Sequence, residues 1–236
     1  MFGRFRLHAF LKSPTLIPSA VRNLFIQVQE TPNPLTLKFL PGQAILDSGR
    51  TYEYTTPSAA KQSPLAIQLF RIEGVKGVFF GEDFVTVTKD SDAEWAMMRP
   101  HVFATISDFV TAGREAVSSG EAAPGQPEDT VIQEDDSETV AMIKELLDSR
   151  IRPMVQEDGG DIAFRGFDEA SGVVSLKLKG SCTGCPSSGV TLKSGIQNML
   201  QFYVPEVKDV VEVKDEEDEL IEIQLKKFEK DKGIAE

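Results

Sequence analysis

Cys182 and Cys185 are the only cysteines in this chain of 236 residues, and two residues separate them. Thiolates at this spacing can point at one centre, where they ligate a soft metal or exchange with a disulfide. Gly180 and Gly184 permit the backbone bends that this requires. Pro186 suits the first position of a helix, so we expect both thiols near the positive end of a helix dipole, which favours the thiolate. The pair is therefore predicted to be redox-active or metal-binding.

Three chemistries compete for this pair, and they differ in the number of ligands they need. A dithiol oxidoreductase needs only two thiols, but its motif usually lies in a βαβ unit, whereas the strands before this loop predict an antiparallel hairpin. A structural zinc site wants four ligands, and His8 and His101 lie far away in sequence, so zinc would need a second chain. A cubane iron-sulfur cluster also wants four thiolates, so it would be shared by two protomers. A packed or idle cysteine pair is the remaining interpretation, which the surrounding Gly, Ser and Pro disfavour.

The composition excludes several other classes of protein. Hydrophobic residues make up 41% of the chain and charged residues 26%, and no apolar run approaches the ~20 residues that cross a bilayer, so we expect no transmembrane protein. The chain has 25 basic and 37 acidic residues and a net charge of -12, which makes nucleic acid and membrane surfaces poor candidates for partners. Two cysteines are too few for a disulfide-stapled secreted scaffold.

The first residues have a composition of their own. Residues 1–29 contain no Asp or Glu, and their apolar positions could gather loosely on one side of a helix. This is typical of a mitochondrial transit peptide, which we place at residues 1–23, with a disordered basic tail as the alternative. A secretory signal needs an unbroken apolar region, which Pro14 and Pro18 interrupt. The basic residues of the segment are Arg4, Arg6, Lys12 and Arg22.

Residues 24–110 predict a first small α+β domain. Alternating apolar residues predict two strands joined by a turn, and Ser63 followed by Pro64 predicts the start of a short helix that ends at Gly74. A second strand pair follows, and then a helix that Ser91 and Glu94 would begin as a capping box and that Pro100 would bend or delay. The expected strands cover residues 24–29, 35–39, 75–80 and 84–88. No residue of this domain has catalytic spacing, and His101 is interpreted as a surface or packed histidine; we assign the domain to partner recognition, with a folding or solubility module as the alternative.

A linker and a second small α+β domain follow. Residues 111–136 lack aromatic residues and become acidic towards their end, which is typical of a flexible linker that lets two domains sample many orientations. Residues 137–213 predict the order helix, strand, strand, helix, strand, with the first helix broken at Pro153. The cysteine loop lies between the second of these strands and the second helix. Residues 214–236 form a charged tail for which no role is predicted.

Several motifs in order resemble a known family. Residues 155–161, VQEDGGD, and residues 180–188, GSCTGCPSS, are similar to the NifU-type C-terminal domain, as are residues 195–200. Residues 39–42, 63–66 and 79–84 are similar to the N-terminal domain of the mitochondrial two-domain form of the Nfu iron-sulfur cluster scaffold proteins. The resemblance covers about residues 24–213, and the motifs together are far more specific than the cysteine pair alone.

The resemblance implies a carrier in the mitochondrial matrix and not an enzyme. It implies that Cys182 and Cys185 ligate a [4Fe-4S] cluster that bridges two protomers of a homodimer. It also implies that the cluster passes to apo-proteins such as lipoyl synthase, respiratory complex subunits and aconitase-type enzymes. A dithiol-disulfide oxidoreductase remains the alternative function, and a zinc-bridged dimer the third.

Two groups of neighbours of the cysteine loop could contribute. Lys177, Lys179 or Lys193 could moderate the negative charge of a thiolate-bound cluster, although lysines on a half-buried strand are more often its solvated face. Residues 158–161 could shape the segment opposite the cysteines, although a helix end followed by a turn explains their glycines equally well.

Overall fold

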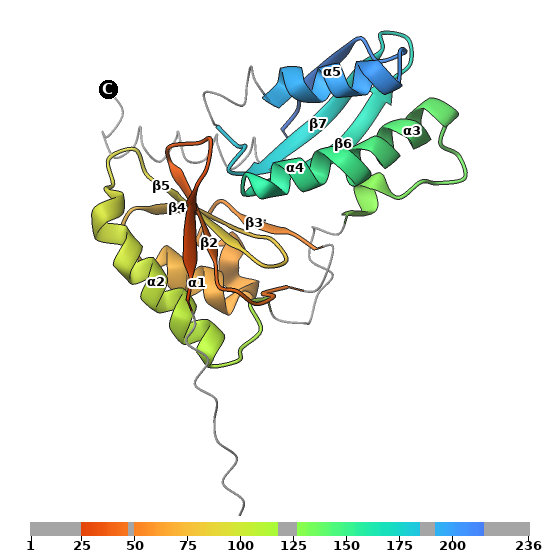
Figure 1. The fold of residues 1–236 in the computed structure, drawn as a ribbon. Helices are drawn as coiled ribbons and strands as arrows, with labels where there is room; N and C mark the ends of the chain where they lie inside the picture. The colour runs from red at the N-terminus through yellow and green to blue at the C-terminus, as the bar shows by residue number, and fades with distance from the viewer. Residues whose placement is uncertain (1–24, 47–49, 118–126, 185–191, 215–236) are drawn as a thin grey trace, which may run out of the picture.

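Two α+β domains make up the protein in a computed structural model, which describes residues 25–46, 50–117, 127–184 and 192–214 (Figure 1). This confirms the predicted fold class. Within these ranges no helix is both long enough and apolar enough to cross a bilayer. The predicted transit peptide lies outside the described residues, as does all of the tail except Lys214.

The N-terminal domain is built on one antiparallel sheet of five strands. Its strand order is β1-β2-β5-β4-β3, and Val85 of β5 pairs with both Phe39 of β2 and Phe80 of β4. The four strands that alternation predicted are therefore all present. The five strands are β1 (Gln27–Glu30), β2 (Thr36–Leu40), β3 (Tyr52–Tyr54), β4 (Val75–Phe80) and β5 (Val85–Lys89).

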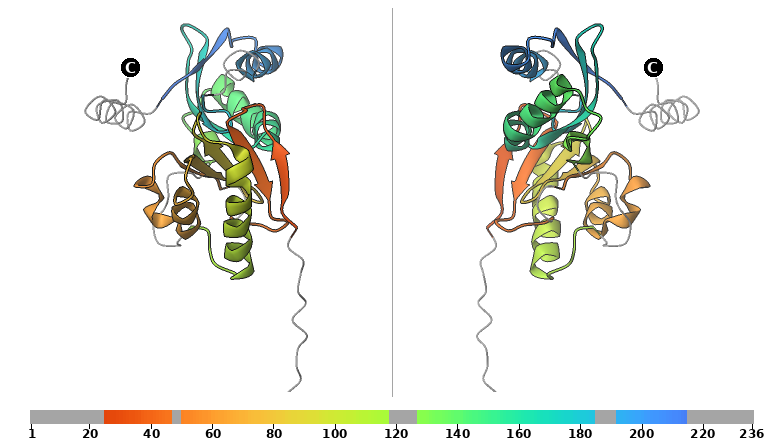
Figure 2. Two further views of the ribbon diagram at one scale, coloured as in Figure 1. Left: turned by 90° about the vertical axis from the view of Figure 1, so that its left-hand side faces the viewer. Right: turned by 90° about the vertical axis from the view of Figure 1, so that its right-hand side faces the viewer.

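Two helices cover one face of this sheet. Helix α1 (Pro64–Phe70) begins where the sequence predicted, because the Ser63 hydroxyl accepts a hydrogen bond from the Ala66 N–H at 3.0 Å. Helix α2 (Trp95–Thr111) follows β5. Every second residue of the central strands points at these helices and is buried, which makes a dry core that includes Leu37, Phe39, Val78, Phe80, Val85 and Val87. The opposite face of the sheet meets the C-terminal domain (Figures 1 and 2).

Three details of this domain differ from the sequence-based expectation. The short edge strand β3 and a 3-10 turn (Ala59–Gln62) were missed in a stretch that is otherwise polar. The predicted capping box was wrong. The Ser91 hydroxyl donates to the carboxylates of Asp90 and Asp92 at 3.2 and 3.3 Å, and α2 begins at Trp95 without a side-chain cap. Pro100 lies inside α2 and does not delay its start.

The C-terminal domain begins with a helix that continues past its proline. Helix α3 (Glu138–Leu146) leads into a π-helical turn (Leu147–Ile151), and α4 (Arg152–Glu157) follows without a break. The predicted break at Pro153 was therefore wrong. Pro153 falls in the first turn of α4, directly after the π turn, in which the Arg152 N–H donates to the Leu147 carbonyl oxygen, so the wider turn precedes the residue that lacks an N–H.

A three-stranded sheet completes the C-terminal domain. Strands β6 (Gly160–Asp168) and β7 (Val173–Gly180) form the predicted antiparallel hairpin. Helix α5 (Lys193–Tyr203) then leads to β8 (Asp209–Glu212), which pairs with β7 in parallel. The cysteine loop therefore lies within a parallel βαβ crossover. The sequence predicted only an antiparallel hairpin before this loop, and its use as an argument against the oxidoreductase interpretation was wrong.

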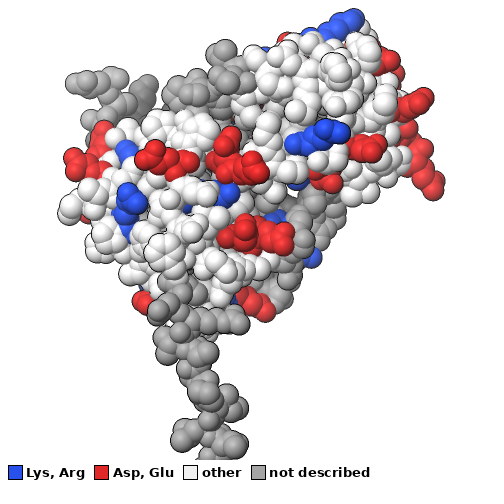
Figure 3. All heavy atoms as spheres, in the orientation of Figure 1, with Lys and Arg blue, Asp and Glu red and all other residues white. Residues whose placement is uncertain are grey.

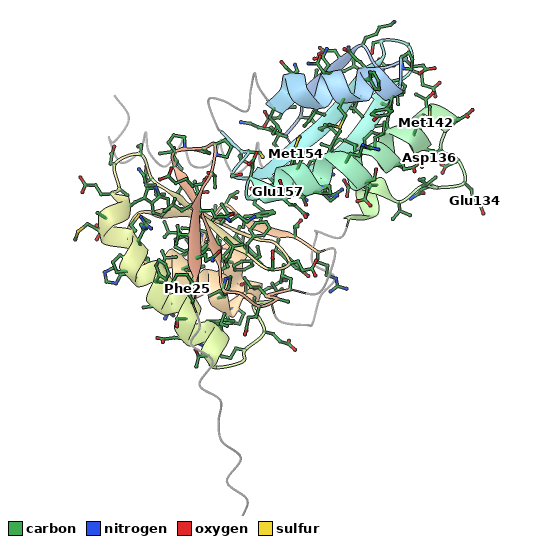
Figure 4. The ribbon with its side chains drawn as sticks, in the orientation of Figure 1. Phe25, Glu134, Asp136, Met142, Met154 and Glu157 are labelled. Carbon is green, nitrogen blue, oxygen red and sulfur yellow. The ribbon has the colours of Figure 1, made fainter. Side chains whose placement is uncertain are left out.

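The end of the predicted linker contacts the C-terminal domain. A 3-10 turn (Pro127–Thr130) places Asp129 where its carboxylate accepts the Phe164 N–H at 2.7 Å and pairs with Arg152 at 3.3 Å. Acidic side chains then gather at the end of this domain that lies away from the N-terminal domain, over the segment before α3 (Figure 3). Glu134 and Asp136 mark that place in Figure 4.

Candidate functional site

The cysteine loop begins with a tight turn at the end of β7. The Thr183 N–H donates to the Gly180 carbonyl oxygen at 3.2 Å, and this turn carries Cys182. Gly180 and Gly184 have φ angles of 64° and 65°, so both adopt the left-handed conformation that glycine tolerates best. The bends predicted from these two glycines are confirmed. Cys185 and Pro186 lie outside the described residues.

The Cys182 thiol lies in the C-terminal core and against the start of β6. Its side chain is 5% exposed and belongs to the apolar cluster that includes Ile162, Leu178 and Ile196. A Cβ added to Gly160 would lie 2.5 Å from the Cys182 Sγ, which is closer than two such atoms can approach. A glycine at this position therefore makes the room in which the sulfur sits.

The segment opposite the cysteine is tied to the loop by its backbone. The Ser181 hydroxyl donates to the Asp158 carbonyl oxygen at 2.7 Å, and the Ser181 N–H donates to the Gly159 carbonyl oxygen at 3.3 Å. Burial raises the pKa of the Asp158 carboxyl, and the nearby Glu157 charge adds to this. Residues 158–160 thus shape the site and also end α4, as the two sequence interpretations proposed.

A buried ion-pair network fixes the other end of this segment. The Arg152 guanidinium donates to the Asp161 carboxylate at 2.9 Å and to the Ile162 carbonyl oxygen at 3.0 Å. Burial alone would lower the pKa of Arg152, but the charges of Asp161, Asp129 and Asp148 reverse this and leave its pKa raised. Since Asp161 is only 1% exposed, its charge depends on Arg152 for compensation.

Two side chains of the N-terminal domain hold the cysteine loop directly. The Asn33 amide donates to the carbonyl oxygens of Ser181 at 3.1 Å and Thr183 at 3.3 Å, which flank Cys182 on both sides. The Glu53 carboxylate accepts the Gly180 N–H at 2.8 Å and the Thr183 hydroxyl at 3.5 Å. The loop backbone is therefore hydrogen-bonded to one donor, the Asn33 amide, and to one acceptor, the Glu53 carboxylate, of the N-terminal domain.

Further contacts join the N-terminal sheet to the opposite segment. The Lys38 ammonium donates to the carbonyl oxygens of Gln156 and Glu157 at 2.9 and 3.1 Å, at the end of α4 where carbonyls are otherwise unpaired. Figure 4 shows Glu157 at this junction of the two domains. The pKa of Lys38 is lowered by burial, although the charges of Asp83, Glu157 and Asp158 oppose that shift.

The lysines proposed to moderate a cluster have other placements. The ammonium of Lys193, the first residue of α5, lies 3.8 Å from the carboxylate of Asp209, the first residue of β8. Lys177 and Lys179 alternate with buried Leu176 and Leu178 and are half-buried on the other face of β7. These positions fit the solvated-face interpretation, and the effect of each lysine on a bound cluster stays a prediction.

Within the described residues, no group of three or more His, Cys, Asp or Glu side chains could hold a metal ion. The described part of the site contributes one soft donor, the Cys182 sulfur, on a loop with a defined backbone. The second donor predicted from the sequence is Cys185.

Local sequence patterns predicted none of the N-terminal residues at the site. Asn33 reads as part of a turn, Glu53 lies in the strand that was missed, and Lys38 alternates with apolar residues as a solvated residue does. Their partners lie between 118 and 150 positions away along the chain. No local pattern links residues at that separation, although an alternating strand does indicate which residues lie on the second face of the sheet.

Comparisons with known proteins cover both domains. The family model described as "Scaffold protein Nfu/NifU N terminal" matches residues 26–113. The model described as "NifU-like domain" matches residues 143–211, which include the cysteine loop and residues 158–161 opposite it.

Curated relatives match most of the chain. A protein of Drosophila sechellia named "NFU1 iron-sulfur cluster scaffold homolog, mitochondrial" is 57% identical over 89% of this chain and 72% of its own length. The Homo sapiens protein of the same name is 55% identical over 89% of this chain and 82% of its own length. A solution NMR structure of a NifU-like protein from Saccharomyces cerevisiae covers 51% of this chain and 100% of that chain, with a TM-score of 0.40 and 22% identity.

Proposed function

The chain belongs to the Nfu family of iron-sulfur cluster scaffold proteins, and we propose that Cys182 and Cys185 ligate a [4Fe-4S] cluster shared by two protomers. The observation that carries this proposal is the placement of Cys182. It lies on a backbone bent at Gly180 and Gly184, at the end of β7 and before α5, in a chain with one other thiol. Two thiolates from each of two chains complete the four that a cubane cluster takes.

Cys182 supplies a soft donor at a position where the fold leaves room for it. The absence of a side chain at Gly160 makes space for the sulfur, and the thiolate is the form of cysteine that ligates iron. Because each chain brings half of the ligands, the cluster would lie at an interface between chains. A cluster that is bound in this way can leave when the two chains separate, which fits a carrier better than an electron-transfer protein.

The recipients follow from the scaffold role. We expect the protein to deliver its cluster to apo iron-sulfur proteins of the mitochondrial matrix, such as lipoyl synthase, respiratory complex subunits and aconitase-type enzymes. The relatives that share over half of its residues are named mitochondrial, and residues 1–23 have the composition of a transit peptide. In this role the protein binds and transfers, and it catalyses no reaction of its own.

One observation favours a second function. In chain order the two cysteines fall between β7 and α5, and β7, α5 and β8 form a parallel βαβ crossover, which is the setting of thioredoxin-like dithiol motifs. A dithiol-disulfide oxidoreductase is therefore the alternative, and it requires both thiols to be accessible in one chain without metal.

Substitution of the two cysteines tests the proposal. We expect full-chain protein that is reconstituted anaerobically with iron and sulfide to retain its cluster, and Cys182→Ser and Cys185→Ser to retain only background iron, because each dimer then loses two of four ligands. Ser188→Ala, in the same motif but without a thiol, is the matched control and should retain wild-type iron. A full cluster in either cysteine variant would contradict the ligand assignment, and a metal-free chain that reduces disulfides would favour the alternative.

A further inference from the structure

The second face of the N-terminal sheet is polar, yet it is buried. Thr36, Lys38 and Thr86 point away from α1 and α2 and are 1%, 6% and 0% exposed. One face of an antiparallel sheet ordinarily faces water when its residues are of these types. Here the C-terminal domain covers that face, which we call the outer face (Figure 1). The outer face also includes Glu53 and Phe79.

The outer face binds the two segments that form the cysteine site. Beyond the Asn33, Lys38 and Glu53 contacts described above, the Thr86 hydroxyl donates to the Gly159 carbonyl oxygen at 2.7 Å. The Thr51 hydroxyl, next to β3, donates to the Asp161 carboxylate at 2.7 Å. Most of these bonds reach backbone groups of residues 156–159 and 180–183, so the outer face recognises the shape of the two segments.

Glycines allow the close approach of the two domains. A Cβ added to Gly180 would lie 2.9 Å from the Phe79 Cγ, and one added to Gly159 would lie 2.9 Å from the Thr86 Oγ1. Phe79 is 2% exposed but belongs to neither of the two domain cores. It is the apolar anchor of an otherwise hydrogen-bonded contact.

This contact opposes the binding of an anionic cluster. A cluster ligated by four thiolates carries negative charge and is stabilised by nearby N–H donors. In the docked arrangement the Gly180 N–H is already taken by the Glu53 carboxylate, which brings a negative charge to the loop that would carry the cluster. The Asn33 amide at the same time holds the loop backbone on both sides of Cys182, which fixes the loop against the N-terminal domain, whereas sharing a cluster requires the loop to face a second chain.

We infer that the outer face of the N-terminal sheet is a docking surface for the chain's own cysteine loop, and that it must release the loop before two protomers share a cluster. This inference rests on the function proposed above. Because coupling is reciprocal, docking should weaken cluster binding by the same factor by which a bound cluster weakens docking. Substitutions that weaken docking should therefore favour cluster binding. The released outer face would then stand open in the cluster-bound dimer.

A double substitution on the outer face tests this inference in the full chain. Lys38→Met with Thr86→Val removes three hydrogen bonds to residues 156–159 and keeps the size of both side chains. Thr88→Val is the matched control, because Thr88 lies two residues along the same face and its side chain makes no hydrogen bond to the C-terminal domain within the described residues. Neither change touches a cysteine or the apolar core.

Docking is measured first, in metal-free protein, by the hydrogen exchange rate of the Gly180 N–H, whose acceptor is Glu53. We expect the double variant to exchange about tenfold to hundredfold faster than wild type, since each lost bond weakens docking severalfold, and Thr88→Val to match wild type. Unchanged exchange in the double variant would overturn the docking surface.

Cluster loading is measured next, on the same proteins, from the rate of dimer and chromophore formation during anaerobic reconstitution. We expect the double variant to load faster than wild type, because a larger fraction of its chains has a released loop. Faster exchange with an unchanged or slower loading rate would overturn the inference and leave the proposed function standing. If wild type and double variant both bind no cluster, the proposed function fails, and the inference that rests on it falls with it.

Discussion

The two faces of the N-terminal sheet are both buried, but by different means. On the inner face Phe39, Val85 and Val87 are fully buried against the helices and need no polar partner. On the outer face Lys38 and Thr86 are buried only because backbone carbonyls of the C-terminal domain accept their hydrogen bonds. Water can replace those acceptors when the domains part, whereas nothing in water replaces the packing of the inner face.

This difference separates a permanent contact from a reversible one. Exposure of the inner face would lose the hydrophobic free energy that holds the domain together. The outer face resembles the more polar contacts between domains that can move relative to each other. The inner face of this sheet therefore forms the core of the N-terminal domain, and its outer face forms a contact with the C-terminal domain that can dissociate.

The largest expected effect on unfolding is at the inner face, at Phe80. Phe80→Ala on β4 removes a fully buried ring from the dry core, so we expect the free energy of unfolding of the N-terminal domain to fall by about 3–5 kcal/mol. Chemical denaturation monitored at Trp95 measures this. Phe25→Ala removes a ring that is 76% exposed and serves as the control. A loss below ~1 kcal/mol would show that the inner face is not the dry core described here.

The inner face also has a pH response of its own. Burial raises the pKa of Tyr54 to about 12, so its phenol is neutral in the folded protein over a wider range than in the unfolded chain. The neutral Tyr54 phenol therefore stabilises the folded protein fully below pH 10. This contribution to the free energy of unfolding, at most about 3 kcal/mol, is lost as the pH rises through about 12. Tyr54→Phe should show a shallower fall in unfolding free energy than wild type between pH 10 and pH 12. Parallel curves for the two proteins would contradict burial of the phenol.

Phe79→Ala should have the smallest effect on unfolding, although Phe79 precedes Phe80 on the same strand. Its ring is buried against Gly180 of the other domain, so its loss should weaken docking and change the unfolding free energy of the N-terminal domain by less than about 1.5 kcal/mol. Faster exchange at the Gly180 N–H would record the weaker docking. A loss of unfolding free energy as large as that of Phe80→Ala would remove the distinction between the two faces.

Local patterns predicted most of the fold because burial on one side leaves a period in the sequence. Alternation found β2 and β5, and Ser63 with Pro64 gave the start of α1. The edge strand β3 was missed because three residues carry too short a pattern, although Tyr52 and Tyr54 do alternate around Glu53. Periodicity also carries no strand direction, and so the parallel pairing of β7 with β8 was not anticipated.

The candidate site was predicted in its chemistry but not in its surroundings. Cys182 and the glycines beside it are local signals, and the structure confirms the bends at both glycines. The hydrogen bonds of Asn33 and Glu53 to the loop depend on how the two domains pack together. The residues next to each position in the sequence carry no information about that packing. For the same reason the composition of residues 111–136 predicted two domains in many mutual orientations and did not indicate the hydrogen bonds between them.

The shared cluster is tested most directly by the native mass of the full chain after anaerobic reconstitution, measured together with its iron, sulfide and zinc content. We expect two chains with one [4Fe-4S] cluster, which separate into single chains when the cluster is removed. A single chain that holds its own complete cluster, or a dimer that holds zinc in its place, would contradict the shared cluster at Cys182 and Cys185.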